Sequence, residues 1–296
     1  MPDFVDAHHH FWDLSLDGYD FWKVYRGADP DNKKAGMEAL FGRSYESICQ
    51  DFLPADLELL GQPMGLKKSV HIETTCPSEW LGEARWIDSL HQKTGWPSAQ
   101  IAAVDLKADD IADRVAQLMG LGSFRGIRSI TFADPRPLFD SGFWRGLGEL
   151  NRNALVLDAD FDWTLFPVLR DVADRFPDMR IVLGHAGFPK LRTPEYFRCW
   201  SRAMAELAAT TTIHCKISGL GMADHSWSLS SISPWVQATI DAFGPDRTMF
   251  GSNWPVDSLY SEYKDVWEAY ETLVQSYQPA ERHAMFVKNA EAFYCI

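Results

Sequence analysis

Short apolar runs rich in β-branched residues recur along the chain, and stretches with apolar residues at helical spacing separate most of them. The apolar runs predict eight strands, at residues 4–8, 69–74, 100–105, 126–130, 154–158, 180–185, 212–218 and 247–251. Helical patterns occupy residues near 80–93, 110–120, 141–152, 164–176, 195–209, 234–243, 262–276 and 280–293. Because strands that alternate with helices pair in parallel, the eight repeats predict an α/β fold, with residues 1–296 forming one (β/α)8 TIM barrel domain.

An open, doubly wound sheet is the alternative arrangement of alternating strands and helices. The first predicted strand lacks the glycine-rich phosphate-binding loop that is typical of such sheets, so the barrel is favoured. The connection between the first two predicted strands, about residues 11–66, is unusually long, and we expect it to form a loop over the C-terminal mouth of the barrel. It contains Trp12 and Trp22, which either line a substrate pocket or close the mouth by packing.

The composition, with 46% hydrophobic and 23% charged residues, is that of an ordinary globular enzyme. A net charge of −13 disfavours nucleic acids and anionic membranes as partners, because both attract basic surfaces. The five cysteines form no CxxC motif, no apolar run approaches the ~18 residues of a membrane-spanning helix, and no signal peptide is recognisable. We therefore expect a cytoplasmic protein with a small-molecule substrate, either monomeric or, given its many aromatic residues, a homodimer.

Candidate chemistry lies at the predicted strand ends, where the working groups of such a barrel gather. The first strand offers His8 and His10, which alternate in phase with Asp6 and are expected to share a face. Two histidines at this spacing are suited to bind a metal ion. An expression-tag remnant is the alternative, but the Phe-Trp-Asp that follows does not resemble a linker.

The second and fourth strands offer further polar groups. His71 and Glu73 are in phase with each other, and we expect both to point into the barrel. The Glu73 carboxylate is a candidate base, metal ligand or partner of another site residue, and the alternative for both residues is a hydrogen-bonded polar plug. Arg128 follows a glycine in the fourth strand, where its guanidinium forms either a fork for a substrate oxygen or a structural salt bridge.

The later strands add charged groups and a third histidine. Asp158 and Asp160 either orient a histidine, bind hydroxyl groups or cap a loop. His185 stands between small residues, which favours close approach to a ligand over a role in the core. Lys216 is expected to point into the barrel, where it needs Glu73 or Asp158 as a partner, or an anionic substrate.

The eighth strand ends at Asn253, with Asp257 four residues later. An aspartate at position 253 would be a good general base for activating water. An asparagine cannot accept a proton at neutral pH, although its amide still orients a water molecule or a carbonyl group.

These residues belong to a series of segments that resembles the amidohydrolase superfamily when taken in order. The branch it resembles is the amidohydrolase 2 group, which includes sugar lactonases and 2-pyrone-4,6-dicarboxylate lactonase. The segments are residues 5–13, 104–106, 126–128, 182–185, 215–220, 243–247, 250–256 and 289–294.

The resemblance implies that His8, His10 and His185 bind one divalent cation, zinc or manganese, or polarise a carbonyl group without a metal. It also implies that Arg128 contacts the substrate and that position 253 is the acid or base. Asn253 departs from the usual aspartate at that position.

Glu73 is a second departure, because it stands where relatives often have an amide side chain. We therefore hypothesise that the catalytic carboxylate has moved to Glu73 or Asp257. The other expected substrate contacts are Trp12, Trp22, His71, Asp158 and Lys216.

The predicted function is hydrolysis of a small lactone, of a sugar acid or a carboxylated ring, by activated water. A metal-dependent decarboxylase of the same superfamily is one alternative, since it would use the same histidines on a carboxylated substrate. A ligand-binding protein that lost catalysis with the change at Asn253 is the other.

Overall fold

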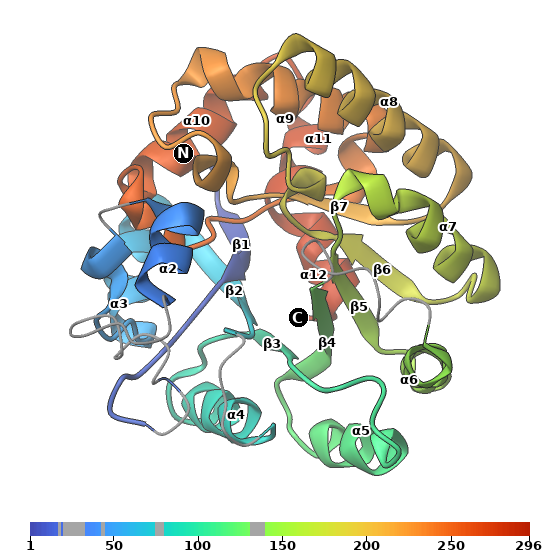
Figure 1. The fold of residues 1–296 in the computed structure, drawn as a ribbon. Coiled ribbons are helices and arrows are strands. Elements are labelled where there is room, and N and C mark those ends of the chain that lie inside the picture. The colour runs from blue at the N-terminus through green and yellow to red at the C-terminus, as the bar shows by residue number, and fades with distance from the viewer. Residues whose placement is uncertain (17–18, 20–32, 43–44, 75–79, 131–139) are drawn as a thin grey trace.

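The computed structural model describes residues 1–16, 19, 33–42, 45–74, 80–130 and 140–296. Eight parallel strands pair in the order β1 to β8, which confirms the predicted TIM barrel (Figure 1). The barrel closes between its first and last strands, where the backbone N–H of His10 donates to the Trp254 carbonyl oxygen at 2.7 Å. The strands are β1 (Phe4–His9), β2 (Leu66–Ile72), β3 (Ala99–Ala102), β4 (Phe124–Ile130), β5 (Val156–Asp160), β6 (Arg180–Leu183), β7 (His214–Ile217) and β8 (Thr248–Phe250).

Helices surround the strands and cover their outer faces (Figure 1). Those that follow the predicted pattern are α4 (Gly82–Thr94), α5 (Ile111–Met119), α6 (Ser141–Arg152), α7 (Phe166–Arg175), α8 (Pro194–Thr210), α9 (Leu229–Phe243) and α10 (Tyr263–Leu273). The helix predicted near 280–293 is divided into α11 (Pro279–His283), a π-helical turn (Ala284–Lys288) and α12 (Asn289–Tyr294). Helix α9 begins earlier than predicted because the Ser228 hydroxyl caps it by accepting from the Ser231 N–H.

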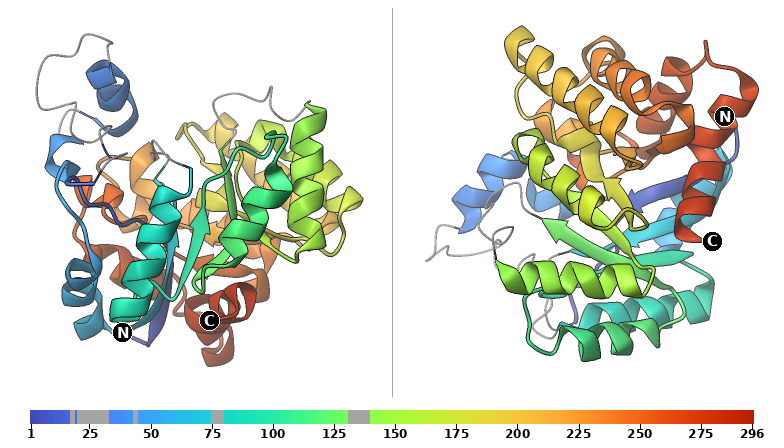
Figure 2. Two further views of the ribbon diagram at one scale, coloured as in Figure 1. Left: turned by 90° about the horizontal axis from the view of Figure 1, so that it is seen from below. Right: turned by 90° about the vertical axis from the view of Figure 1, so that its right-hand side faces the viewer.

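The long connection after β1 also contains two helices that the sequence pattern does not predict. It contains α2 (Lys33–Phe41) and α3 (Pro54–Gly61). Figure 2 shows α2 at one end of the barrel and both chain termini at the other. The strands therefore present their C-terminal ends on the side of α2, as expected for the mouth.

No helix in these described ranges combines the length and apolar character needed to cross a membrane. Cys49, Cys199, Cys215 and Cys295 are all free thiols. The cytoplasmic location stays a prediction.

Candidate active site

The end of β1 brings two histidines together by means of a β-bulge. Between Asp6 and His9, β1 carries one residue more than the paired segment of β2. An extra residue interrupts the alternation of faces. The prediction that Asp6 is in phase with His8 and His10 is therefore wrong. The Asp6 carboxylate accepts from the Tyr263 hydroxyl of α10 at 3.0 Å. The rings of His8 and His10 lie 5.1 Å apart, so these two side chains do share a site.

His185, which follows β6, completes this histidine cluster (His8, His10 and His185). Its ring centre lies 4.4 Å from that of His8. The Ser218 hydroxyl oxygen is 3.0 Å from His185 Nδ1 and fixes the orientation of the ring. His185 has a left-handed backbone, with φ of 49°. Such a conformation costs about 1–2 kcal/mol in a non-glycine residue and is often retained at functional sites.

His10 has a defined tautomer. Its Nδ1 lies 2.7 Å from the Ile72 carbonyl oxygen, which only accepts hydrogen bonds, so Nδ1 carries the hydrogen. Burial, together with the Arg128 guanidinium, lowers the pKa of His10 well below its ordinary value and keeps the ring neutral at pH 7. His10 Nε2 is therefore an unprotonated acceptor, and it lies 3.4 Å from Oδ1 of Asn253.

His8 is fully buried, and neither of its ring nitrogens has a hydrogen-bond partner among the described residues. Burial and the charge of Lys216 lower the pKa of His8 well below its ordinary value. A neutral ring still carries one N–H group, and leaving it unpaired costs about 1–3 kcal/mol. A ligand oxygen within the histidine cluster would satisfy this donor.

Arg128 from β4 is held by two acidic residues. Its Nε donates to Asp160 Oδ2 at 2.6 Å. Its Nη1 donates to the Glu73 carbonyl oxygen at 2.9 Å and lies 3.5 Å from Glu73 Oε1. The structural salt bridge and the substrate contact predicted for Arg128 are therefore compatible, because the salt bridge holds the guanidinium near His10 and His185. Asp160 is a candidate from the sequence, but its ion pair with Arg128 was not predicted.

Lys216 and Asp158 form an ion pair inside the barrel. Lys216 Nζ lies 2.5 Å from Asp158 Oδ2, and both side chains are fully buried. The Tyr294 hydroxyl of α12 donates to the same Asp158 oxygen at 3.4 Å. The prediction that Lys216 points inward towards Asp158 is confirmed. Because α12 lies at the end of the barrel away from α2, this pair forms the floor of the site and does not reach its open side.

His71 points to the outer layer, and the prediction that it shares a face with Glu73 is wrong. Its Nδ1 accepts from the backbone N–H of Phe11 at 3.0 Å, and its Nε2 lies 3.2 Å from Glu83 Oε1 in α4. Both ring nitrogens are thus engaged away from the histidine cluster. His71 anchors the start of the long connection to α4 and is not placed to contact a substrate.

Trp12 and Trp22 differ in what the structure says of them. The Trp12 ring is fully buried, stacks against His10 at 6.4 Å between ring centres and donates its Nε1–H to the Gln50 carbonyl oxygen at 2.6 Å. It therefore supports the His10 ring by packing. Trp22 lies outside the described residues.

Asn253 and Asp257 lie in the turn after β8. Asn253 adopts a left-handed backbone with φ of 57°, which asparagine tolerates better than most residues. Its Nδ2 donates to Asp257 Oδ1 at 3.0 Å. Burial raises the pKa of Asp257 to about 7. Asp257 therefore stands behind Asn253, and Asn253 separates it from the histidine cluster.

The charges around the histidine cluster weaken it as a site for a divalent cation. Within the ranges that the structure describes, no group of three or more His, Cys, Asp or Glu side chains is arranged to hold a metal ion. Asn253 supplies no negative charge. The charges of Lys216 and Arg128 also lower the pKa of His8, and the same field opposes a doubly charged ion. The use of His8, His10 and His185 as ligands of one divalent cation stays a prediction.

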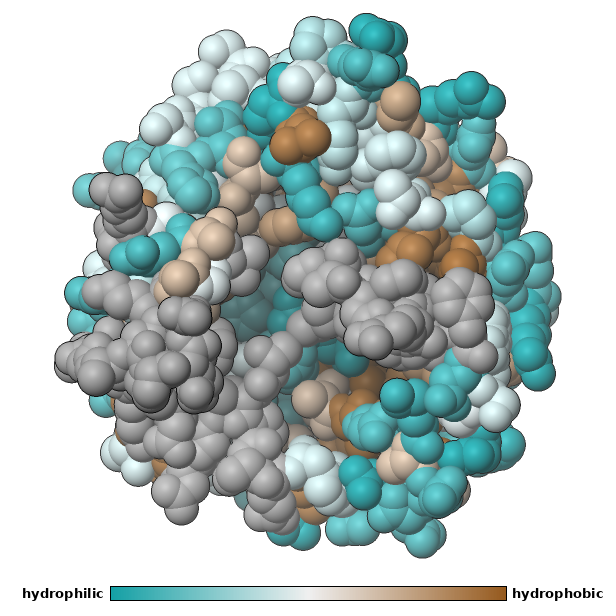
Figure 3. All heavy atoms as spheres, viewed as in Figure 1, coloured by the Kyte–Doolittle hydropathy of each residue, from teal (hydrophilic) through white to brown (hydrophobic). Residues whose placement is uncertain are grey.

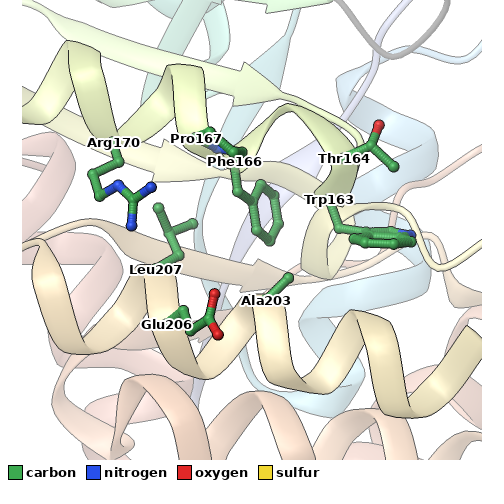
Figure 4. Close-up of a pocket in the computed structure, with 8 residues that line it drawn as sticks. All are labelled: Trp163, Thr164, Phe166, Pro167, Arg170, Ala203, Glu206 and Leu207. Carbon is green, nitrogen blue, oxygen red and sulfur yellow. The ribbon is translucent and has the colours of Figure 1, made fainter.

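The mouth of the barrel is hollowed, and Figure 3 shows hydrophilic residues at the bottom of this hollow. A second cavity, of about 200 Å³, lies between α7 and α8 (Figure 4). Apolar and charged side chains such as Phe166, Arg170 and Glu206 line it, and none of the candidate site residues does. Of these two hollows, only the one at the mouth contains candidate site residues.

Comparison with known proteins agrees with this arrangement. The chain is 33% identical to an uncharacterized protein of Sinorhizobium fredii over an alignment of 301 residues, which covers 98% of this chain and 97% of that protein. It is 31% identical to an L-fucono-1,5-lactonase of Burkholderia ambifaria, over 99% and 95% of the two chains. A crystal structure of a Burkholderia multivorans amidohydrolase with bound zinc matches with a TM-score of 0.82 and 30% identity, over 99% of both chains. The family model for amidohydrolases of the amidohydrolase 2 type matches residues 5–296, and the chain belongs to this family.

Proposed function

We propose that this amidohydrolase hydrolyses the lactone of a sugar acid, with the protein's own groups activating the water. The observation that carries the proposal is the fixed tautomer of His10, whose unprotonated Nε2 lies in the histidine cluster. The unpartnered ring of His8 beside it supports the same reading. The identity to the Burkholderia ambifaria L-fucono-1,5-lactonase favours a sugar-acid ring as the substrate.

The first step is attack of water on the lactone carbonyl carbon. His8 donates its N–H to the carbonyl oxygen, which becomes negatively charged as the C–O bond to water forms. The nearby charges of Arg128 and Lys216 stabilise that oxygen, since charge–charge interactions are strong in a buried site. The proton of the attacking water passes to His10 Nε2.

The second step opens the ring. The bond between the carbonyl carbon and the ring oxygen breaks, and the ring oxygen takes the proton from His10 Nε2. One lactone and one water thus give one hydroxy acid, and His10 returns to its neutral form.

The Burkholderia multivorans structure contains zinc, and a metal in this chain would polarise the carbonyl oxygen. No step of the proposed reaction depends on one, because His8 and the nearby charges of Arg128 and Lys216 stabilise the developing negative charge. We expect purified protein, prepared without a histidine tag, to hydrolyse sugar-acid lactones such as L-fucono-1,5-lactone at the same rate before and after treatment with a chelator. Metal content by mass spectrometry and proton release from the product acid in a pH-indicator assay, against the uncatalysed rate, are the measurements.

Three other outcomes would change the proposal. Activity that disappears with the chelator and returns with zinc or manganese would contradict the metal-free mechanism but retain the lactonase. Release of carbon dioxide from carboxylated substrates without lactone hydrolysis would replace the lactonase with a decarboxylase. Tight binding of a lactone without turnover would make the chain a binding protein.

Gly184 offers a test of the Arg128 position. A Cβ atom at Gly184 would overlap Asp160 Oδ1. Gly184→Ala is therefore expected to displace the carboxylate that holds Arg128 and to lower kcat/KM by ~10²-fold, as misplacement by about 1 Å often does. Steady-state kinetics measure this effect. Gly148→Ala in α6, where an added Cβ meets nothing within 4 Å, is the matched control and should keep wild-type kinetics. Wild-type kinetics in Gly184→Ala would show that Asp160 does not position Arg128 for the reaction.

A further inference from the structure

Two hydrogen-bond acceptors face each other at the mouth of the barrel. His10 Nε2 carries no hydrogen, because Nδ1 donates to the Ile72 carbonyl oxygen. Asn253 directs its Oδ1 towards the same point, because its Nδ2 donates to Asp257. The two acceptors lie 3.4 Å apart and cannot bond to one another.

A water molecule resolves this conflict, because it carries two O–H donors and can serve both acceptors. The amide oxygen then orients the water, while His10 Nε2 accepts the hydrogen that leaves during attack. The orientation of the Asn253 amide decides whether this arrangement exists, since a reversed amide would place an N–H donor against His10 and remove the second acceptor.

We infer that Asp257 is a positioning residue that holds the Asn253 amide so that its oxygen, together with His10 Nε2, binds the attacking water. This inference rests on the proposed lactone hydrolysis and deepens it. It also gives a role to the departure at position 253, because an asparagine needs a partner to fix its orientation whereas an aspartate has two equivalent oxygens.

The surroundings of Asp257 favour this role over a purely structural one. Asp257 is 3% exposed, and a small cavity of about 10 Å³ adjoins it. Burying a carboxylate is costly unless several donors pair with it. No Lys or Arg side chain pairs with Asp257 among the described residues, and its donors are the Asn253 amide and the Gly221 backbone. The cavity is otherwise lined by Leu220, Gly221, Trp227, Ile232, Val266 and Tyr270.

Protonation of Asp257 should reverse the amide. Burial raises the pKa of Asp257 to about 7. The titratable groups that face it are Tyr260 from its own turn and Tyr270 from α10, and burial raises the pKa of both, so they stay neutral. The other residues that line the cavity carry no charge. A protonated Asp257 would donate to Asn253 Oδ1, which turns Nδ2 towards His10. We therefore expect kcat to fall as the pH falls through about 7.

The first arm of the test is kinetic. Asp257→Ala is expected to lower kcat by ~10–100-fold and to leave KM within ~2-fold, because water positioning acts on the chemical step. Asp257→Asn, which keeps an acceptor but does not titrate, should recover part of kcat and lose the acid limb near pH 7. Asp88→Asn is the matched control, because Asp88 is another buried carboxylate whose partners are Ser123 and Gln92. Unchanged kcat in Asp257→Ala, or an acid limb that persists in Asp257→Asn, would overturn the inference.

The second arm does not depend on turnover. Nuclear magnetic resonance of 15N-labelled protein reports the side-chain amide of Asn253, assigned by its disappearance in Asn253→Ala. We expect this signal to move as the pH passes through about 7 in the wild type and to stay fixed in Asp257→Ala. If the Asn253 signal titrates but the protein hydrolyses no lactone, Asp257 does orient the Asn253 amide and the proposed function is wrong. A signal that does not titrate in the wild type would overturn the inference, whatever the turnover.

Discussion

Replacing His10 with alanine is expected to lower kcat for lactone hydrolysis by ~10²–10⁴-fold, the range typical of a lost general base. The reason is geometric. The Ile72 carbonyl fixes the hydrogen on Nδ1, and Arg128 and burial keep the ring neutral, so Nε2 carries no hydrogen at pH 7. KM should change little, since His10 acts on the water and not on the sugar ring. Steady-state kinetics with a sugar-acid lactone measure both constants.

His9 and Glu73 provide the comparisons for this prediction. His9 is as buried as His10, but its Nε2 lies 2.9 Å from the Ser69 hydroxyl oxygen, so His9→Asn is expected to keep kcat within ~3-fold. Added imidazole should restore part of the activity of His10→Ala, because a free base can occupy the space left by the ring. A larger loss of kcat in Glu73→Gln than in His10→Ala would move the base to Glu73.

The barrel could be predicted from the sequence because its strands are buried on both faces and read as short apolar runs. All eight strands lie within a few residues of the predicted positions. Helices α2 and α3 were not predicted, because the connection after β1 carries no sustained helical pattern. Their stability comes from packing on the rest of the chain, which local sequence does not reveal.

The histidine cluster could be predicted because strand ends of a barrel converge at its mouth. The orientation of Glu73 relative to His71 could not, because β2 ends at Ile72 and the alternation of faces ends with it. Nor could the orientation of Asp6. A β-bulge adds one residue and reverses the faces on either side, and nothing in an alternating pattern marks where it occurs.

The position of Asp257 also depends on three-dimensional geometry that the spacing alone does not give. The left-handed backbone at Asn253 turns the chain so that the side chain four residues later returns behind the amide. The sequence identified Asp257 as a candidate base, whereas the contact with Asn253 gives it the place of a partner. One hydrogen bond of 3.0 Å, from Asn253 Nδ2 to Asp257 Oδ1, thus distinguishes the role of partner from that of base.

The buried ion pair of Lys216 and Asp158 is expected to contribute to the free energy of unfolding. Lys216→Met is expected to lower the free energy of unfolding by ~3–5 kcal/mol, because it leaves the Asp158 carboxylate buried without its partner. Chemical denaturation measures this loss. Lys68→Met is the control for loss of a lysine charge, since the Lys68 pair with Glu291 is 35% exposed on both sides and should contribute ~1 kcal/mol or less.

The pH dependence of the Lys216→Met effect identifies its cause. Burial raises the pKa of Asp158, and the Lys216 ammonium opposes that rise, so the pKa should rise further in Lys216→Met. A group whose folded pKa lies above its unfolded value loses stability as the pH increases through that interval. The stability loss should therefore be smaller at about pH 5 than at about pH 8, and a second change, Asp158→Leu, should recover much of it. A loss that is equal at both pH values and unaffected by the second change would instead indicate lost packing of the lysine stem.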